Sequence, residues 1–168
     1  MSVKEIAKLG NPVLRKKCRR VENPKSTETK QIVQDLFDTL ADFKKKNGFG
    51  RGIAAPQVGK SFRIIVINVD EPIAMINPRI NETSQTMMTL WDDCFSFPEL
   101  MVKLHRHKSI SLKYTDLNGV RQRFNATERL SELIQHEIDH LDGILSIDRA
   151  ISSEAIILTS EYKKRFKH

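Results

Sequence analysis

Five consecutive residues restrict what this chain can fold into more than any other segment. They are His136, Glu137, Ile138, Asp139 and His140. On an α-helix, residues four apart lie about 40° apart on one face. Two neutral imidazoles placed in this way can bind one metal ion, and a neighbouring glutamate can accept a proton from water that the ion binds. The alternative is a helix that carries two histidines on a solvated face.

The residues around this segment predict the helix independently. Asn125 and Glu128 have the spacing of a capping box, and Gly143 supplies a C-terminal stop. Apolar residues recur between these ends at helical spacing: Leu130, Leu133, Ile134 and Leu141. The sequence therefore predicts a rigid, buried helix, on which a metal ion would give both imidazole rings a partner.

Two histidines are one ligand short of a catalytic metal site, which usually has three protein ligands. The third downstream histidine of longer zincin motifs is absent, so an acidic residue or a cysteine is expected. Cys94 is the outstanding candidate, because it follows Asp92 and Asp93 in a stretch of acids and turn formers. The alternative for Cys94 is a small buried apolar side chain, and that is the interpretation adopted for Cys18.

The run of residues 48–59 is rich in glycine and alanine. Gly50 and Gly52 followed by two alanines would let the backbone approach a strand or a bound peptide closely. A tight turn after a helix is the preferred interpretation of this run alone. No Lys-Ser or Lys-Thr follows the glycines, so the run is not a phosphate loop.

Three segments together resemble the peptide deformylase family. They are Gly50-Arg51-Gly52-Ile53-Ala54-Ala55-Pro56-Gln57, Asp92-Asp93-Cys94-Phe95-Ser96 and Gln135-His136-Glu137-Ile138-Asp139-His140. Their order and spacing match the family over nearly the whole chain. The resemblance implies that Cys94, His136 and His140 bind one divalent metal ion, which is ferrous iron in the cell and zinc, nickel or cobalt in some preparations. A Cys-His-His set suits several of these ions.

The resemblance also implies the catalytic residues. Glu137 would act as general base and then as general acid. Gln57 and the backbone N–H of Phe95 would stabilise the oxyanion. The substrate would be the N-formyl group of formyl-methionine, or of another formylated residue, on a nascent or short peptide. Formate would be released.

The chain departs from the family around the substrate. Asp92 and Asp93 replace the usual Glu-Gly before the cysteine, and charged residues stand where the family is mostly aliphatic. We expect the following residues to contact substrate: Arg51, Gly52, Leu90, Asp93, Arg129, Glu132 and Leu133. A charged pair such as Arg129 and Glu132 is as readily explained by a solvated helix face. If these charges line the pocket, the enzyme should prefer a smaller or more polar first residue than methionine.

Length and charge define the organisation and the partners. The 168 residues predict a single deformylase-like domain covering residues 1–168. A net charge of +7 is explained by a solvated surface, or by ribosome docking through basic runs such as residues 163–168. The sequence contains no motif that reads bases, so we do not expect sequence-specific nucleic-acid binding. It contains no apolar run that is long enough to cross a membrane. Two cysteines and no recognisable targeting segment predict a cytoplasmic protein without a disulfide framework.

The expected fold is α+β: a single domain with mostly antiparallel sheets around a central metal-binding helix, and with a C-terminal helix. Helices are predicted over residues 29–46 and from about residue 152. Strands are predicted over residues 62–69, 74–77, 101–105, 109–114 and 120–124, with a turn at residues 116–119 before the last of them.

Three other functions remain open from the sequence. A related N-deacylase with altered specificity would use the same site. A zincin-type metallopeptidase needs only the two histidines and the glutamate, and a third protein ligand other than Cys94 would favour it. A non-catalytic relative that binds peptides or ribosomes would have no need of Glu137 and Gln57 together.

Overall fold

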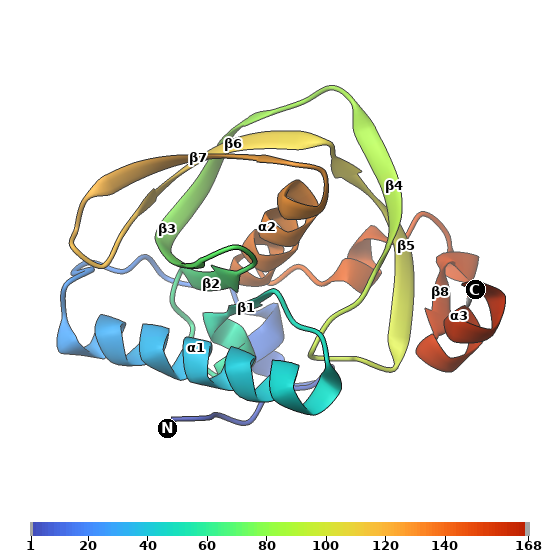
Figure 1. The fold of residues 1–168 in the computed structure, drawn as a ribbon, viewed down its shortest axis with the longest axis horizontal. Helices are drawn as coiled ribbons and strands as arrows, with labels where there is room; N and C mark the ends of the chain where they lie inside the picture. The colour runs from blue at the N-terminus through green and yellow to red at the C-terminus, as the bar shows by residue number, and fades with distance from the viewer. Residues whose placement is uncertain (1, 167–168) are drawn as a thin grey trace.

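Helix α2, residues Glu128–Leu141, lies at the centre of the structure, and the other elements surround it (Figure 1). The computed structural model describes residues 2–166. Two more α-helices are α1 (Thr27–Asn47) and α3 (Thr159–Phe166). Short 3-10 helices are η1 (Pro12–Arg15), η2 (Ala55–Val58), η3 (Ser146–Arg149) and η4 (Ser153–Ala155).

The strands of the described residues form two antiparallel sheets. The five-stranded sheet has the order β1-β2-β3-β6-β7, with β1 (Gly52–Ala54), β2 (Ile64–Asn68), β3 (Pro72–Thr83), β6 (Ser109–Thr115) and β7 (Arg121–Thr127). The three-stranded sheet has the order β4-β5-β8, with β4 (Met87–Asp92), β5 (Leu100–His107) and β8 (Ile156–Leu158). Antiparallel sheets around the central helix confirm the predicted α+β class.

Helix α1 begins and ends close to where the sequence predicts. Ser26 caps its first turn by accepting a hydrogen bond from the backbone N–H of Thr29 at 3.1 Å. Gly48 ends it with a φ of 79°, a left-handed conformation that glycine adopts without strain. Its buried stripe packs on strands β1 and β2 and includes Ile32, Val33, Leu36, Leu40 and Phe43.

Strand β2 explains why a continuous apolar run is needed at residues 64–67. All four residues are buried, because α1 covers one face of the strand and α2 the other (Figure 1). The side chains of Ile65 and Ile67 pack with α2, while those of Ile64 and Val66 pack with α1. The metal-binding helix is therefore held against the sheet by a core on its own side. Cys18 belongs to that core, and burial raises its pKa to about 11.

Several predicted elements differ from the structure, including the strand predicted over residues 74–77, which extends over Pro72–Thr83 as β3. Asn125 does not cap α2, because β7 continues to pair with β6 as far as Thr127, and the helix starts at Glu128 with a φ of 52°. The C-terminal helix starts at Thr159 rather than near residue 152, since η4 and β8 come first. The glycine-rich run is partly a turn, but its residues 52–54 form strand β1. Strands β4 and β8 were not predicted.

Within residues 2–166, none of the helices has the length and apolar character that crossing a lipid bilayer requires. Lys167 and His168 of the basic run lie outside the described residues.

Candidate metal centre and active site

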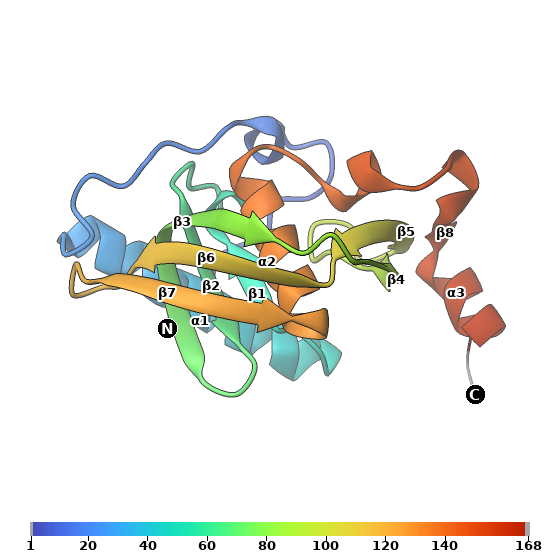
Figure 2. The ribbon, with the colours of Figure 1, turned by 90° about the horizontal axis from the view of Figure 1, so that it is seen from above.

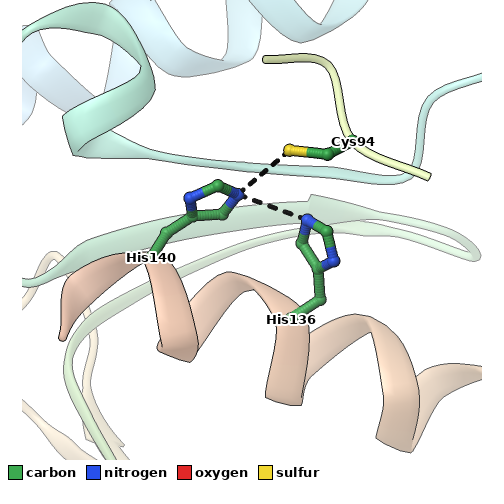
Figure 3. A group of neighbouring side chains, drawn as sticks. All are labelled: Cys94, His136 and His140. Atoms are coloured by element: carbon green, nitrogen blue, oxygen red, sulfur yellow. Dashed lines mark hydrogen bonds between the residues drawn. The ribbon is translucent and has the colours of Figure 1, made fainter. Parts of the chain in front are cut away.

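Cys94, His136 and His140 meet in one buried cluster (Figure 3). The two histidines project from successive turns of α2, and the cysteine comes from the loop after β4. Nε2 of His140 lies 3.3 Å from Sγ of Cys94 and 3.2 Å from Nε2 of His136. The candidate ligand atoms of all three residues lie within 4.8 Å of one another. The predicted ligand set is therefore brought together.

The spacing of these atoms fits a tetrahedral cation. With metal–nitrogen bonds of about 2.05 Å and a metal–sulfur bond of about 2.3 Å, tetrahedral geometry puts the nitrogens about 3.3 Å apart and sulfur about 3.6 Å from each nitrogen. The two shortest observed separations, 3.2 Å and 3.3 Å, are close to these values. Nδ1 of His136 contacts Oδ2 of Asp92 at 2.8 Å, which places the ring proton there and leaves Nε2 free to coordinate.

The electrostatics of the histidine pair also favour a cation. Burial opposes a charge on either ring, but the carboxylate of Asp92 raises the pKa of His136 well above its ordinary value. Burial and the charge on His136 hold the pKa of His140 well below its ordinary value. The two rings together thus stabilise one positive charge between them. A divalent cation can take the place of that proton and also attract the sulfur of Cys94.

A series of hydrogen-bonded charged side chains supports the metal ligand His136. The guanidinium of Arg106 contacts Asp92 at 3.4 Å and Asp139 at 2.5 Å, and Arg106 is only 2% exposed. Arg149 donates two further hydrogen bonds to Asp139, at 2.6 Å and 2.7 Å. His136 and Arg106 hold the pKa of Asp92 below its usual value against the effect of burial. Asp92 is therefore ionised where it meets the histidine.

Arg106 and Asp139 are functional residues that the sequence interpretation missed. A signal was present in β5, where Val102, Leu104 and Arg106 alternate at positions that face the core. An arginine at a core-facing strand position requires a buried acid as partner. Which acids would meet it could not be read from the sequence, because Asp92 and Asp139 lie on different elements.

Glu137 lies beside the metal ligands without an ionic partner. Its Oε2 atom is buried and has no hydrogen-bond partner among residues 2–166, and burial raises its pKa to about 7. Strand β1 passes close to it at Gly52, where an added Cβ would lie 3.3 Å from Oε1 of Glu137 and 3.1 Å from Leu133. A side chain at residue 52 would therefore require this carboxylate and Leu133 to shift by a few tenths of an ångström. The carboxylate can exchange protons with a ligand in the pocket.

Gln57 is fixed in orientation by its neighbours. Its Oε1 accepts a hydrogen bond from the backbone N–H of Ala54 at 3.0 Å. Its Nε2 donates to Oγ of Ser96 at 3.2 Å and lies 3.8 Å from Sγ of Cys94. The amide donor of Gln57 thus points toward the metal ligands. The backbone N–H of the adjacent Phe95 makes no hydrogen bond within residues 2–166.

The N-terminal segment forms hydrogen bonds both to the residues around Gln57 and to the loop that carries Cys94. The backbone N–H of Ala7 donates to the carbonyl of Gln57 at 2.7 Å, and that of Leu9 donates to the carbonyl of Ser96 at 2.9 Å. Nζ of Lys8 donates to the carbonyl of Phe95 at 2.9 Å. Three consecutive residues therefore link η2, which carries Gln57, to the loop that carries Cys94.

A pocket of about 890 Å³ opens over the metal ligands. All seven residues that the sequence assigns to substrate contact line it: Arg51, Gly52, Leu90, Asp93, Arg129, Glu132 and Leu133. Arg51 forms an ion pair with Glu132 and donates to the backbone carbonyl of Arg129 at 3.1 Å. Burial and the nearby carboxylate of Asp92 raise the pKa of Asp93 and of Glu132. This end of the pocket is therefore polar, and the Arg129 side chain forms no part of the ion pair.

Known proteins resemble this chain over nearly its full length. A family model described as polypeptide deformylase matches residues 3–155. Peptide deformylase 2 of a Nostoc species is 38% identical over 95% of this chain and 92% of its own. The peptide deformylase of Dictyoglomus turgidum is 41% identical over 92% of this chain and 97% of its own.

Solved structures agree with this result. The peptide deformylase of Synechococcus elongatus, in complex with actinonin, has a TM-score of 0.85 and 31% identity, covering 98% of this chain and 86% of its own. The peptide deformylase of Thermotoga maritima has a TM-score of 0.84 and 33% identity, covering 90% of this chain and all of its own. Together with the Cys94, His136 and His140 cluster, these similarities place the chain in the peptide deformylase family.

Proposed function

We propose that this enzyme hydrolyses the N-formyl group of formyl-methionine, or of another formylated residue, at the N-terminus of nascent or short peptides. The attacking water forms a bond to the formyl carbon, the carbon–nitrogen bond breaks, and formate and a free amine leave. The observation that carries this proposal is the convergence of three ligand atoms and an unpaired buried carboxylate in one pocket.

The metal ligands in this mechanism are Cys94, His136 and His140. A divalent cation held there would supply a Lewis acid that makes water a stronger nucleophile and polarises the formyl carbonyl. Cys94 would hold the cation through its sulfur, and Asp92 keeps the proton of His136 on Nδ1, so that Nε2 is free to bind. In the cell we infer ferrous iron, and zinc, nickel or cobalt can occupy the same donor set in preparations.

Glu137 moves the proton in this mechanism. Its free carboxylate accepts a proton from the attacking water and then donates it to the leaving amine. A raised pKa suits both roles, because a base that is too weak would not take the proton and one that is too strong would not return it. Glu137 is therefore first the general base and then the general acid.

Gln57 and Phe95 stabilise the charge that develops on the formyl oxygen. The amide Nε2 of Gln57 already faces the metal ligands, and the N–H of Phe95 is free to donate. Donors that are fixed before the reaction lower the barrier without reorganising during it. The hydrogen bonds from Ala54 to Gln57 and from Lys8 to the carbonyl of Phe95 provide that rigidity.

The charged end of the pocket sets the substrate preference. The ion pair of Arg51 with Glu132 lies on the helix face that leads to His136, and Asp93 also lines the pocket, without an ionic partner within 4.0 Å among residues 2–166. Placing a methionine side chain against these groups would remove water from charges without replacing their hydrogen bonds. We therefore infer that a smaller or more polar first residue is preferred, with Gly52, Leu90, Arg129 and Leu133 as further contacts.

The cellular partners follow from the same assignment. We infer that the enzyme acts in the cytoplasm, where its nascent-chain substrates are made, and that its positive charge supports docking on the ribosome. A peptidase function is disfavoured because the third metal ligand is Cys94. An N-deacylase with another acyl substrate remains the second candidate, supported by the unusual charges of the pocket.

Formate release from a panel of peptides tests this proposal. Protein purified without oxygen is analysed for bound metal and then assayed on formyl-peptides that differ only in the first residue. We expect one equivalent of metal and a higher kcat/KM for serine, alanine or glutamine than for methionine. A matched acetyl-peptide series is the control, and faster release of acetate than of formate would favour the N-deacylase. A strong preference for methionine would disprove the inferred specificity while leaving the deformylase activity in place.

A further inference from the structure

A second groove lies on the five-stranded sheet, away from the metal centre. It has a volume of about 580 Å³ and shares no lining residue with the pocket over the metal ligands. Among residues 2–166, no helix covers the outer face of β3, β6 and β7, and α2 lies on the other side (Figure 2). Five cations line the groove: Arg20, Arg79, Lys113, Arg121 and Arg123.

The strand register places three of these cations in one row. Arg79 of β3 lies opposite Lys113 of β6, and Lys113 lies opposite Arg123 of β7. Arg121 is two residues before Arg123 and so faces the same side of the sheet. Like charges directly opposite one another destabilise a sheet. Nothing in the folding of the sheet explains why this row should be entirely positive.

Acidic side chains do not neutralise the row. None of the five cations forms an ion pair with another group of residues 2–166, whereas Arg51, Arg106 and Arg149 near the metal ligands do. The acid at the end of the groove, Asp116, already accepts hydrogen bonds from Asn118, Val120 and Gln122. Glu82 lies opposite Ser111 and does not line the groove. The positive charge is therefore available to a ligand.

The position of Arg20 is fixed by the neighbouring backbone. The N–H of Val21 donates to Oδ1 of Asn77, and Nδ2 of Asn77 donates to the carbonyl of Val21, both at 2.9 Å. These reciprocal bonds fasten the segment before α1 to strand β3. Because the backbone at Arg20 is held, binding a ligand there orders only the side chain and costs less conformational entropy.

We propose that this groove binds the phosphodiester backbone of RNA. Guanidinium groups match phosphate oxygens with paired hydrogen bonds, and four of the five cations are arginines. A row of cations at about 5 Å intervals across the strands suits a ligand with regularly repeated charges, and such contacts carry no base sequence. The choice of RNA rests on the proposed action on nascent peptides, which are made beside RNA. Since the groove and the pocket do not overlap, the enzyme can bind RNA while it acts on a peptide.

Salt-dependent binding to an RNA oligonucleotide tests this proposal. The probe is a fluorescent single strand of about 16 uridines, a length within the range of known single-strand sites. The groove variant carries Arg79→Gln, Lys113→Gln and Arg123→Gln. The matched control carries Lys163→Gln, Lys164→Gln and Arg165→Gln. It removes an equal number of positive charges, three, from α3. Formate release is measured on all three proteins.

Each lost phosphate contact should reduce the slope of log K against log salt by about 0.7, so three contacts correspond to about 100-fold in affinity near 0.1 M salt. We expect this loss in the groove variant, a small change in the control, and unchanged formate release in both. Equal losses in the two variants would show that only net charge matters and would overturn the proposal. Absence of binding to the wild-type protein, or equally tight binding of polyglutamate, would do the same. Because binding and hydrolysis are measured separately, failure of one does not count as failure of the other.

Discussion

The two halves of helix α2 face the same pocket but are constructed differently. In the C-terminal half, His136 and His140 are buried, and His136 is supported by Asp92, which Arg106 contacts in turn. In the N-terminal half, Glu132 is paired with Arg51, whose side chain is 41% exposed. The C-terminal half can be changed only together with the residues that support it, whereas the N-terminal half depends on the single pair of Arg51 and Glu132. We therefore expect that substitutions in the N-terminal half change substrate preference without removing the metal ligands.

Among the substitutions that separate the two halves of α2, Glu137→Gln should have the largest effect, a loss of catalytic rate. Removal of a general base typically lowers the rate by about 10²- to 10⁴-fold. Because glutamine has the same shape and makes no metal contact here, bound metal should be retained. Glu132→Gln, one turn earlier on the helix, is the matched control and should change kcat by less than about tenfold while altering the substrate preference. Formate release and metal content are measured on both, and equal losses of kcat would remove the distinction between the two halves.

The pH dependence of the wild-type enzyme supplies a further check on Glu137. Burial raises its pKa to about 7, and a base must be deprotonated to act, so kcat/KM should fall as the pH decreases through this group's pKa. A bound cation opposes the effect of burial and moves this acid limb to lower pH. The limb should be absent from the residual activity of Glu137→Gln.

The second largest effect, a loss of metal affinity, is expected from Asp92→Asn. This change keeps the shape of the side chain but removes the charge that orients His136, and such supporting contacts are typically worth 10- to 100-fold in metal affinity. Asp93→Asn is the control, because Asp93 is the next residue after β4 and forms no hydrogen bond with a metal ligand within residues 2–166. Competition with a chelator measures the affinity. If both variants held metal as tightly as the wild type, Asp92 would have no supporting role.

The smallest effect is expected from the double substitution Arg51→Leu with Glu132→Leu. It replaces the ion pair with apolar groups, so kcat/KM for formyl-methionine peptides should rise by about tenfold relative to polar first residues. Arg51→Leu alone leaves Glu132 buried without a partner and should lower the melting temperature more than the double change does. An unchanged ranking of substrates would show that the pair does not contact the first residue.

The metal ligands could be predicted from the sequence because their chemistry is local. His136 and His140 are related by the helical repeat, and a glutamate and a cysteine with suitable neighbours complete the pattern. The start of α2 could not be predicted in the same way, because the pairing of β7 with β6 extends past Asn125 and overrides its capping tendency. The ion pair of Arg51 with Glu132 joins residues that are 81 positions apart. Only the folded structure places those two charges together.

Helix α3 shows a similar limit of sequence interpretation. Residues 152–158 contain good helix formers, but β8 pairs with the edge of β5 at Ile156 and delays the helix to Thr159. Hydrogen bonds to an exposed strand edge outweigh a weak helical preference over such a short segment. The position of an edge strand depends on what lies beside it, which the local sequence does not contain.

The hydrogen bonds of residues 7–9 make this N-terminal strap a structural support of the pocket over the metal ligands. These residues brace Gln57 and the Cys94 loop, although Lys8 precedes Phe95 by 87 positions. The oxyanion donors that we propose, Gln57 and Phe95, are therefore held in position by this N-terminal strap. A protease cut behind Leu9, or a bulky fusion that displaces this strap, would loosen the reaction geometry while leaving every metal ligand on the chain.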